Sequence, residues 1–289
     1  MKIAHLIMAY KNSGQVERMI KAMDHPNFHF YIHLDLKIDI KEFEHLAQLE
    51  RVSFIQNRVL CNWGGFSFVK AIISSLSEIL SQKTSYDFIN LMSGQDYPIK
   101  PIDRLYKFYQ EHPGKCFISY DQDPNAIWWK EAASRAELYH FTDLKFKGKY
   151  FVQSIFNKYL PKRSFPLSIP LYGSSDSSWW TITPECAAYI VDFMKKNPRL
   201  ERFMQYTWGS DEFIIATIIM NSPFKSDVIN NNLRFISWES GRPNPRILTD
   251  NDFDLIKASD KFYARKFDNQ VNVKILDQLD QFIAVKSQV

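Results

Sequence analysis

The sequence predicts an α/β fold in which a mixed central sheet is flanked by helices. Short apolar runs that have the character of buried strands alternate with segments of helical spacing along the first half of the chain. The composition agrees, since 45% hydrophobic and 24% charged residues are typical of a folded globular chain. At 289 residues the chain is long enough for one large α/β domain.

The first elements are a strand at 2–8, a turn at 12–14, a helix at 15–23 and a second strand at 28–34, with a short third strand at 52–55. Strand, helix and strand in this order favour parallel pairing and a Rossmann-like nucleotide-binding half. Parallel strands end at one edge of a sheet, where ligands bind. We therefore expect Ala9 and Tyr10, after the first strand, to face the same crevice as Asp35, after the second.

The middle of the chain continues with a turn at 62–65, a helix at 67–81, a strand at 86–92, a helix at 102–110 and a strand at 116–120. Residues 121–170 carry many aromatic and basic side chains without a clear period. We interpret them as an irregular insertion over the binding site.

The second half is predicted to contain a strand at 179–182, a helix from Pro184 to about 195 capped by Thr183, and a helix at 212–220 opened by Ser210-Asp211-Glu212. A strand at 233–238, a loop at 240–245 and short helices after Asp250 and Asp260 follow. We expect one domain over 1–289, divided into halves at about residue 115.

Several classes of protein and site are disfavoured. The net charge of +4 is modest and no run of five basic residues occurs, which argues against a nucleic-acid interface. Cys61, Cys116 and Cys186 lack the spacing of a zinc or redox motif. The apolar run at the N-terminus is too short for a signal peptide or a membrane span, so we expect a cytoplasmic protein without a transmembrane segment, with peripheral contact at the inner face of a membrane as an open alternative.

Four separated segments carry a resemblance. They are Ile32-His33-Leu34-Asp35, Trp63-Gly64-Gly65-Phe66-Ser67, the string from Leu91 to Lys100 that contains Gly94-Gln95-Asp96-Tyr97-Pro98, and Ser210-Asp211-Glu212-Phe213. In this order they resemble the core-2/I-branching β-1,6-N-acetylglucosaminyltransferases and the related peptide O-xylosyltransferases. The resemblance covers nearly the whole chain and implies a compact, bacterial-type member with a GT-A-like fold.

The resemblance also implies site residues. Such enzymes lack the usual metal-binding Asp-x-Asp and neutralise the departing UDP with basic side chains, so no metal or other cofactor is expected. The catalytic glutamate matches Glu212, and the cations at the diphosphate match Arg246 and Lys266. The nucleotide-sugar contacts fall on Ala9, Tyr10, Asp35, Lys37 and Trp63.

The chemistry fits Glu212 independently of the resemblance. Inverting transfer needs one carboxylate that takes the proton of the acceptor hydroxyl, an effect of roughly 10²–10⁴ in rate. A carboxylate at a helix start is held ionised by the helix dipole, although this also suits an ordinary first-turn glutamate. The departing UDP needs positive charge, which Arg246 and Lys266 can supply.

Asp121-Gln122-Asp123 opposes the metal-free interpretation, because a literal Asp-x-Asp after a strand can bind a divalent cation with a diphosphate. A plain surface turn and a contact to the acceptor are the alternatives. On the acceptor side we place Arg135, Trp238 and Asp96, and Asp96 can instead bond turn amides and fix its loop. Trp179 and Trp180 are adjacent on a predicted strand, so at most one of them can line the site. We apply the same argument to the neighbours Trp128 and Trp129.

The functional hypothesis is transfer of N-acetylglucosamine from UDP-GlcNAc to a saccharide or glycolipid hydroxyl in polysaccharide biosynthesis. UDP-xylose as donor, a metal-dependent enzyme that uses Asp121 and Asp123, and a non-catalytic saccharide-binding module remain the alternatives.

Overall fold

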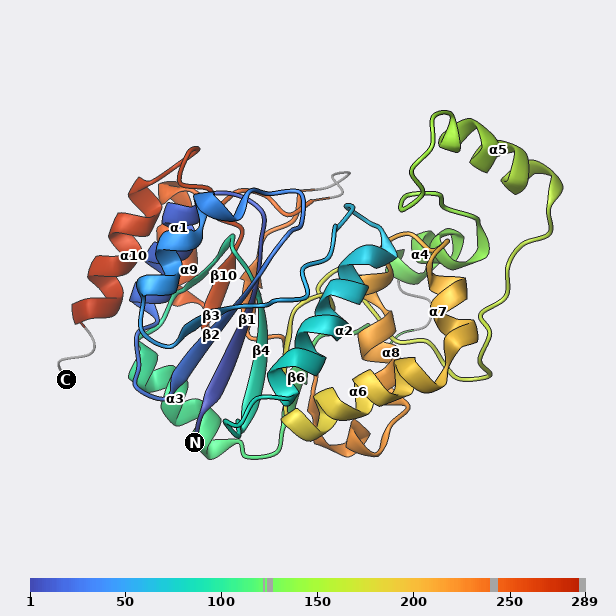
Figure 1. Cartoon of the computed structure of the whole chain (residues 1–289). Helices are drawn as coiled ribbons and strands as arrows, with labels where there is room; N and C mark the ends of the chain where they lie inside the picture. The colour runs from blue at the N-terminus through green and yellow to red at the C-terminus, as the bar shows by residue number, and fades with distance from the viewer. Residues whose placement is uncertain (122, 124–126, 240–243, 286–289) are drawn as a thin grey trace.

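The computed structural model describes residues 1–121, 123, 127–239 and 244–285, and shows a seven-stranded sheet with helices on both faces (Figure 1). The strand order is β3-β2-β1-β4-β7-β6-β8. The first four strands pair in parallel, β7 runs antiparallel to β4 and β6, and β8 is parallel to β6. The α/β class with a mixed sheet flanked by helices is confirmed, whereas the single domain divided near residue 115 stays a prediction. The bounds of the strands are β1 Ile3–Ala9, β2 Phe28–Leu34, β3 Val52–Phe54, β4 Phe88–Ser93, β6 Cys116–Ile118, β7 Trp180–Ile182 and β8 Val228–Ile229.

The register of β1 and β2 brings two loops to the same edge of the sheet. The strands pair in step from Ile3 with Phe28 to Ala9 with Leu34. Beyond the last pair, the Asp35 amide donates to the Ala9 carbonyl at 2.9 Å. The expectation that the loops after the first two strands face one crevice is therefore confirmed.

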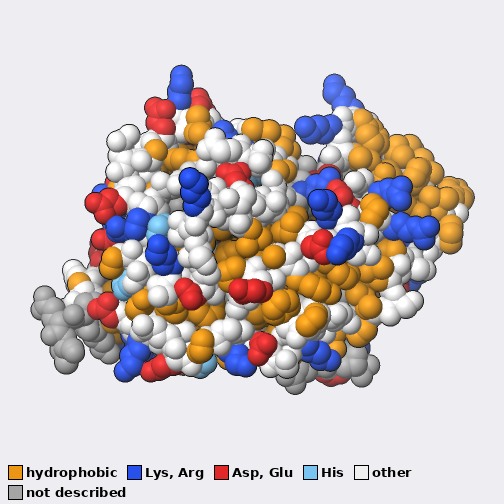
Figure 2. Space-filling view, turned by 60° about the horizontal axis from the view of Figure 1, so that its bottom comes forward, with side chains coloured by type: hydrophobic (Ala, Val, Ile, Leu, Met, Phe, Trp, Pro, Cys, Tyr) orange, Lys and Arg blue, Asp and Glu red, His pale blue; other side chains and the backbone are white. Residues whose placement is uncertain are grey.

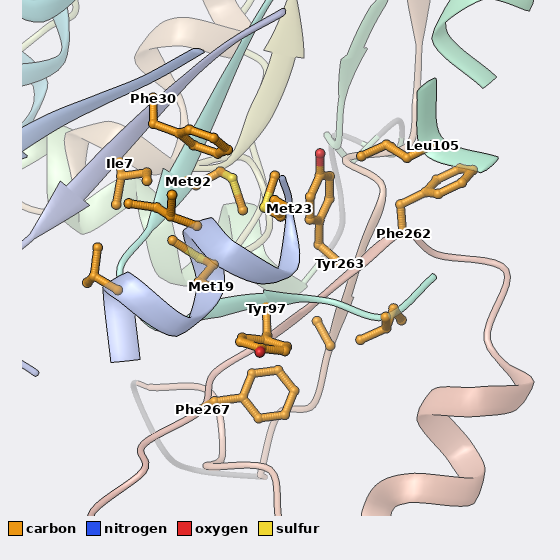
Figure 3. Packing of buried hydrophobic residues seen from close by; sticks show 14 of the residues in the cluster. Ile7, Met19, Met23, Phe30, Met92, Tyr97, Leu105, Phe262, Tyr263 and Phe267 are labelled. Atoms are coloured by element: carbon orange, nitrogen blue, oxygen red, sulfur yellow. The ribbon is translucent and has the colours of Figure 1, made fainter. Parts of the chain in front are cut away.

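One face of the sheet carries a hydrophobic core shared with a second, smaller sheet. Ile3 and Ile7 of β1 point into this core, which Figure 3 shows from close by. The second sheet has the order β5-β10-β9. Tyr97 of β5, Tyr263 of β10 and Phe267, just after β10, belong to the same hydrophobic core. The covering elements are α1 Ser13–Ala22, α3 Ile102–Glu111, α9 Phe253–Ala258, α10 Lys274–Val285, β5 Asp96–Pro98, β9 Arg234–Ile236 and β10 Tyr263–Arg265.

The opposite face receives the alternate residues of β1, including Leu6 and Met8, as the period of two in a strand requires. Its covering helices are α2 Phe66–Leu80, α6 Pro184–Lys196, α7 Pro198–Met204 and α8 Ile214–Met220. Thr183 caps α6, because its hydroxyl accepts the Cys186 amide at 3.2 Å. The prediction of this cap is confirmed. Short 3₁₀ turns occur at Ile40–Glu42, Glu44–Gln48, Ser210–Glu212, Pro223–Asp227 and Asp250–Asp252.

Two predictions of local structure are wrong. The region from 121 to 170 contains the helices α4 (Ile127–Glu137) and α5 (Lys149–Tyr159), so Trp128 and Trp129 lie on a helix and not on a strand. The helix expected after Asp260 is instead strand β10, because Tyr263–Arg265 is buried between β5 and β9 and its backbone joins both in a ladder. None of the described helices is long and apolar enough to cross a lipid bilayer.

Candidate functional site

A cavity of about 350 Å³ lies at the carboxyl edge of the parallel strands. Its size is within the range of small-molecule sites. Most of the predicted site residues line it: Ala9, Tyr10, Asp35, Lys37, Trp63, Glu212, Trp238 and Lys266. Arg135, Arg246 and Asp96, all of them described, are not among its lining residues. The cavity therefore brings together residues that lie up to 257 positions apart, the separation between Ala9 and Lys266.

The end of β2 supplies a fixed carboxylate to one wall. Asp35 is 6% exposed, and its Oδ1 accepts the Lys37 amide at 3.0 Å and the Cys61 amide at 3.4 Å. Its Oδ2 pairs with the Lys37 ammonium at 3.3 Å. The same ammonium donates to the Cys61 carbonyl. Backbone amides hold Asp35 so that a ligand in the cavity meets it without rearrangement of the loop.

Aromatic side chains border the cavity on the same side. Tyr10 is 48% exposed and donates to Gln95 Oε1 at 2.9 Å. Trp63 is 62% exposed and meets the Trp208 ring edge-to-face at 5.1 Å. Gly64, with φ +69°, lets Trp208 approach, because a Cβ at this position would lie 2.2 Å from the indole nitrogen. The exposed faces of Trp63 and Tyr10 are flat apolar surfaces suited to a sugar or a base.

Glu212 lines the cavity and is held by two donors from α4. Its Oε2 accepts the Trp128 indole N–H at 3.1 Å and a hydrogen bond from Arg135 Nη1. Arg135 lies between Trp128 and Trp208, at 5.4 Å and 4.6 Å from the two ring centroids. Among the described residues, both side-chain hydrogen bonds of Glu212 therefore go to Oε2, which leaves Oε1 for a ligand.

Burial and a neighbouring carboxylate act on the proton affinity of Glu212. Burial, followed by the charge of Asp211, raises the pKa of Glu212, and Arg135 opposes this shift. Asp211 accepts the Ser178 hydroxyl at 2.7 Å, and its own pKa is raised by burial. A carboxylate whose pKa is raised but whose ionised form is still hydrogen-bonded is a stronger base than a free glutamate.

The expected helix start at Glu212 differs from the structure. Ser210–Glu212 forms a 3₁₀ turn, and α8 begins at Ile214 with Phe213 in front of it. Gly209 opens this turn in the left-handed region, φ +61°, where a Cβ would lie 2.9 Å from Arg135 Nη1. The ionised form of Glu212 is thus stabilised by Arg135 and Trp128, and not by a place in the first turn of an α-helix.

Two cations that are adjacent in the sequence, Arg265 and Lys266, line the cavity. The Arg265 guanidinium lies 4.2 Å from the Trp179 ring centroid and 3.5 Å from Asp96 Oδ1. Burial lowers the pKa of Lys266, and the charges of Arg265 and Lys11 lower it further. Cations gathered in this way attract an anion, because each added negative charge relieves their mutual repulsion.

Arg246 lies beside this region with its guanidinium turned to another partner. It binds Asp252 through two hydrogen bonds of 2.8 and 2.6 Å, and its amide donates to the Ser237 carbonyl. The neighbouring Asn244 and Pro245 do line the cavity, whereas residues 240–243 of the predicted loop lie outside the described residues.

Trp238 lines the cavity and is anchored by its indole N–H, which donates to Asp176 Oδ1 at 2.9 Å. Burial raises the pKa of Asp176. Asp121 and Asp123 lie outside the residues that line the cavity, although burial and the charge of Asp123 raise the pKa of Asp121. Gln122, between them, lies outside the described residues.

Comparison with protein families gives a match over most of the chain. Residues 3–257 match the model of the Core-2/I-Branching enzyme family. The chain belongs to this family. Its members are glycosyltransferases, so the predicted family and the transferase class are confirmed. Together with the mixed sheet and its parallel N-terminal half, family membership confirms the GT-A-like fold class.

Curated relatives and a solved structure resemble the chain. Mouse xylosyltransferase 2 is 27% identical over 304 aligned residues, which cover 96% of this chain and 33% of that protein. The xylosyltransferase oxt of Drosophila melanogaster is 22% identical and covers 93% of this chain and 32% of that protein. The galactosyltransferase LgtC, solved with donor and acceptor sugar analogues, has a TM-score of 0.49 at 9% identity and covers 96% of this chain and 95% of LgtC. The chain spans about one third of the length of the curated relatives it matches.

One predicted acceptor contact is contradicted by the placement of its side chain. Asp96, in the Gly-Gln-Asp-Tyr-Pro string, is 0% exposed and lies between the guanidinium groups of Arg234, at 3.6 Å, and Arg265, at 3.5 Å. It also accepts the Ser93 amide at 3.2 Å. Asp96 therefore fixes its turn, as the alternative interpretation of the sequence holds, and it also orients Arg265.

Sequence reasoning missed several residues of this family member's cavity. Arg265 stands next to Lys266 in the sequence and lines the cavity, but was given no role. Trp128 and Arg135 lie seven positions apart, which places them on one face of a helix and would have paired them if 127–137 had been predicted as helical. Asp211, inside the Ser210–Glu212 turn, and Trp208, which precedes the turn, also line the cavity.

The contact from Arg135 predicts a pH effect. Glu212 must be ionised to act as a base, so activity should fall as the pH drops through its pKa, which lies above the ordinary glutamate value. In Arg135→Gln the lowering effect of Arg135 is lost, and the acidic limb of kcat should move to higher pH. We expect the shift in a pH–rate profile, with activity recovered at high pH. An unshifted limb would contradict the positioning role of Arg135.

Proposed function

We propose that the chain transfers N-acetylglucosamine from UDP-GlcNAc to a hydroxyl of a saccharide or glycolipid, with inversion and without a metal ion. The observation that carries this proposal is the arrangement of the cavity. A base, Glu212, lies on one wall, and two adjacent cations, Arg265 and Lys266, line the same cavity near the strand ends. Transfer from a nucleotide diphosphate needs these two kinds of group on either side of the reacting carbon.

The proposed reaction is a single displacement. Glu212 Oε1 takes the proton of the acceptor hydroxyl while the hydroxyl oxygen attacks the anomeric carbon. The bond between this carbon and the β-phosphate oxygen breaks, and UDP leaves with the electron pair. Lys266 and Arg265 stabilise the negative charge on the departing diphosphate, and attack from the opposite side inverts the anomeric centre. Water and acceptor compete for the same carbon, so the aromatic border also helps to exclude solvent.

The other lining residues suit recognition of the donor and the acceptor. The Asp35 carboxylate, fixed by amides, can accept hydrogen bonds from the nucleoside, and Tyr10 lies beside it at the neighbouring strand end. Trp63 and Trp238 offer rings for stacking on sugars, and Trp238 is 38% exposed. In this proposal Arg135 acts through Glu212, and Arg246 joins the donor only if it leaves Asp252.

Xylose is the second candidate for the donor sugar. The curated relatives described above are named xylosyltransferases, which favours UDP-xylose, whereas the family name favours the branching reactions of N-acetylglucosamine. Both sugars make the same demands on Glu212 and on the cations.

A donor screen separates these proposals. UDP release should be measured with UDP-GlcNAc, UDP-xylose, UDP-glucose and UDP-galactose, in the presence of mixed oligosaccharide acceptors and with or without EDTA. We expect release from UDP-GlcNAc that survives EDTA. Preference for UDP-xylose would replace the donor assignment, and loss of activity in EDTA with recovery on adding Mn²⁺ would favour Asp121 and Asp123 as metal ligands.

A further inference from the structure

Helix α5 is the least embedded helix of the described chain. None of its residues from Lys149 to Tyr159 is buried. Figure 1 shows it standing away from the sheet and from the helices that cover the sheet. A helix gains most of its stability from burying an apolar face, so its orientation requires a reason.

The side of α5 that faces the protein is held largely by polar side chains, unlike that of an ordinary surface helix. Its polar residues face the protein: Gln153 accepts the Phe141 amide at 2.8 Å, and Asn157 accepts the Tyr139 amide at 2.7 Å and donates to the Tyr139 carbonyl at 2.9 Å. These two residues are four positions apart and therefore share one side of the helix. The loop at 139–141 thus holds α5 by these hydrogen bonds and by the Phe156 ring, which lies edge-on to Phe141 at 5.2 Å and to Tyr139 at 5.8 Å.

Three apolar residues on another side of α5 face solvent. Phe151 is 70% exposed, Ile155 40% and Tyr159 71%, and their spacing of four makes them a continuous stripe. Two positions along a helix correspond to a rotation of about 200°, so Phe151 lies nearly opposite Gln153. We call Phe151, Ile155 and Tyr159 the outer stripe. It is held outward by the bonds of Gln153 and Asn157 and cannot turn inward without breaking them.

Positive charge surrounds the outer stripe. The chain has no acidic residue between Asp143 and Asp176, and this interval contains Lys145, Lys147, Lys149, Lys158, Lys162 and Arg163. Lys145, Lys147 and Lys158 are exposed, and the Lys158 ammonium lies 5.1 Å from the centroid of the Tyr159 ring. Figure 2 shows hydrophobic side chains gathered at this end of the molecule, with Lys and Arg side chains around them.

We propose that α5 is a docking helix that lies in the surface of an anionic lipid bilayer, with the outer stripe in the acyl boundary and the lysines at the headgroups. Aromatic and aliphatic side chains flanked by lysines, without acidic residues, are the chemistry that such a surface binds. A second copy of the chain would bring the same positive charge to the contact, which opposes self-association through this face.

Docking in this way would bring the cavity close to the membrane. Asp143, at the start of the segment that carries α5, accepts hydrogen bonds from Asn62 at 2.9 Å and from the Ser67 hydroxyl at 2.7 Å, on either side of Trp63 at the cavity border. A lipid-linked acceptor would then be presented at this border. This consequence rests on the proposed function, whereas the docking itself does not.

Vesicle sedimentation tests the proposal with the full chain. Vesicles of phosphatidylcholine alone and of phosphatidylcholine with phosphatidylglycerol should be compared at low and high salt. We expect binding to the anionic vesicles that weakens with salt. The stripe variant Phe151→Gln/Ile155→Gln/Tyr159→Gln should lose roughly tenfold or more in partition coefficient. The lysine variant Lys145→Gln/Lys147→Gln/Lys158→Gln should lose at least roughly tenfold as well.

A matched control is available on another face. Leu255, Val271 and Val273 are 62%, 60% and 49% exposed, so Leu255→Gln/Val271→Gln/Val273→Gln removes a similar exposed apolar surface and should leave binding unchanged. Melting temperatures within error of the wild type show that the variants are folded. UDP release with a soluble acceptor should be unchanged in the stripe variant, which separates docking from catalysis.

Three results would overturn the docking proposal. The first is that the wild type does not bind anionic vesicles, and the second is that the stripe variant or the lysine variant binds them as well as the wild type does. The third is that the wild type forms a dimer in sedimentation velocity, that the stripe variant abolishes this dimer, and that no vesicle binding is seen.

Discussion

Glu212→Gln should lower kcat by roughly 10²–10⁴ while UDP binding stays within about twofold of the wild type. The amide keeps the size of the side chain and can still accept the Trp128 and Arg135 hydrogen bonds through its oxygen, but it cannot take a proton from the acceptor. The rate should be measured by UDP release under saturating donor and acceptor, and UDP affinity by calorimetry. The acidic limb of the pH profile should disappear in the residual activity.

The control for this variant is the same substitution at an exposed glutamate outside the cavity. Glu185 lies in the first turn of α6 and is exposed, so Glu185→Gln should leave kcat unchanged. If Glu212→Gln transfers sugar at the wild-type rate, the base has been assigned to the wrong residue. If the wild type binds UDP-sugars and releases no UDP with any acceptor, a non-catalytic saccharide-binding module becomes the better description.

Lys266→Ala should lower kcat by roughly 10²–10³ and weaken UDP binding, because in the proposed reaction this lysine stabilises the negative charge that the leaving diphosphate gains. The ammonium is partly desolvated and repelled by Arg265 and Lys11, so a bound diphosphate relieves this repulsion as well. Affinities for UDP, for uridine and for the acceptor should be measured. The loss should appear for UDP and be absent for uridine, which lacks the phosphates.

Two comparisons sharpen the Lys266 test. Lys83→Ala removes an exposed lysine that does not line the cavity and should change none of these affinities. Arg246→Ala tests whether Arg246 binds the diphosphate, as the family resemblance implies, or only pairs with Asp252, as in the structure. If this variant loses as much UDP affinity as Lys266→Ala, Arg246 must leave Asp252 when the donor binds. If it loses only thermal stability, Arg246 stays paired with Asp252. Equal weakening of UDP and uridine binding by Lys266→Ala would contradict its role at the diphosphate.

The local pattern of apolar and polar residues is sufficient to predict the strands of the parallel half of the sheet. The strand at 28–34 was predicted with the bounds that the structure shows, because continuous apolar runs ended by polar residues can be recognised one segment at a time. The same local pattern does not predict elements whose structure depends on contacts with segments that are distant in the sequence. Tyr263–Arg265 is a strand only because β5 and β9 lie on either side of it. Helix α5 exposes Phe151, Ile155 and Tyr159 to solvent, although apolar residues at a spacing of four usually mark the buried side of a helix.

The sequence by itself determined the α/β class, the family and the candidate base, since these depend on apolar period and on short strings such as Gly-Gln-Asp-Tyr-Pro and Ser-Asp-Glu. Only the tertiary structure decided the surroundings of those residues. It placed Arg135 and Trp128, which lie 77 and 84 positions from Glu212, on the Glu212 carboxylate. It also turned Asp96 inward between Arg234 and Arg265. The physical reason is that proton affinity, burial and charge pairing depend on groups brought together through space by packing, and such contacts leave no local signal in the chain.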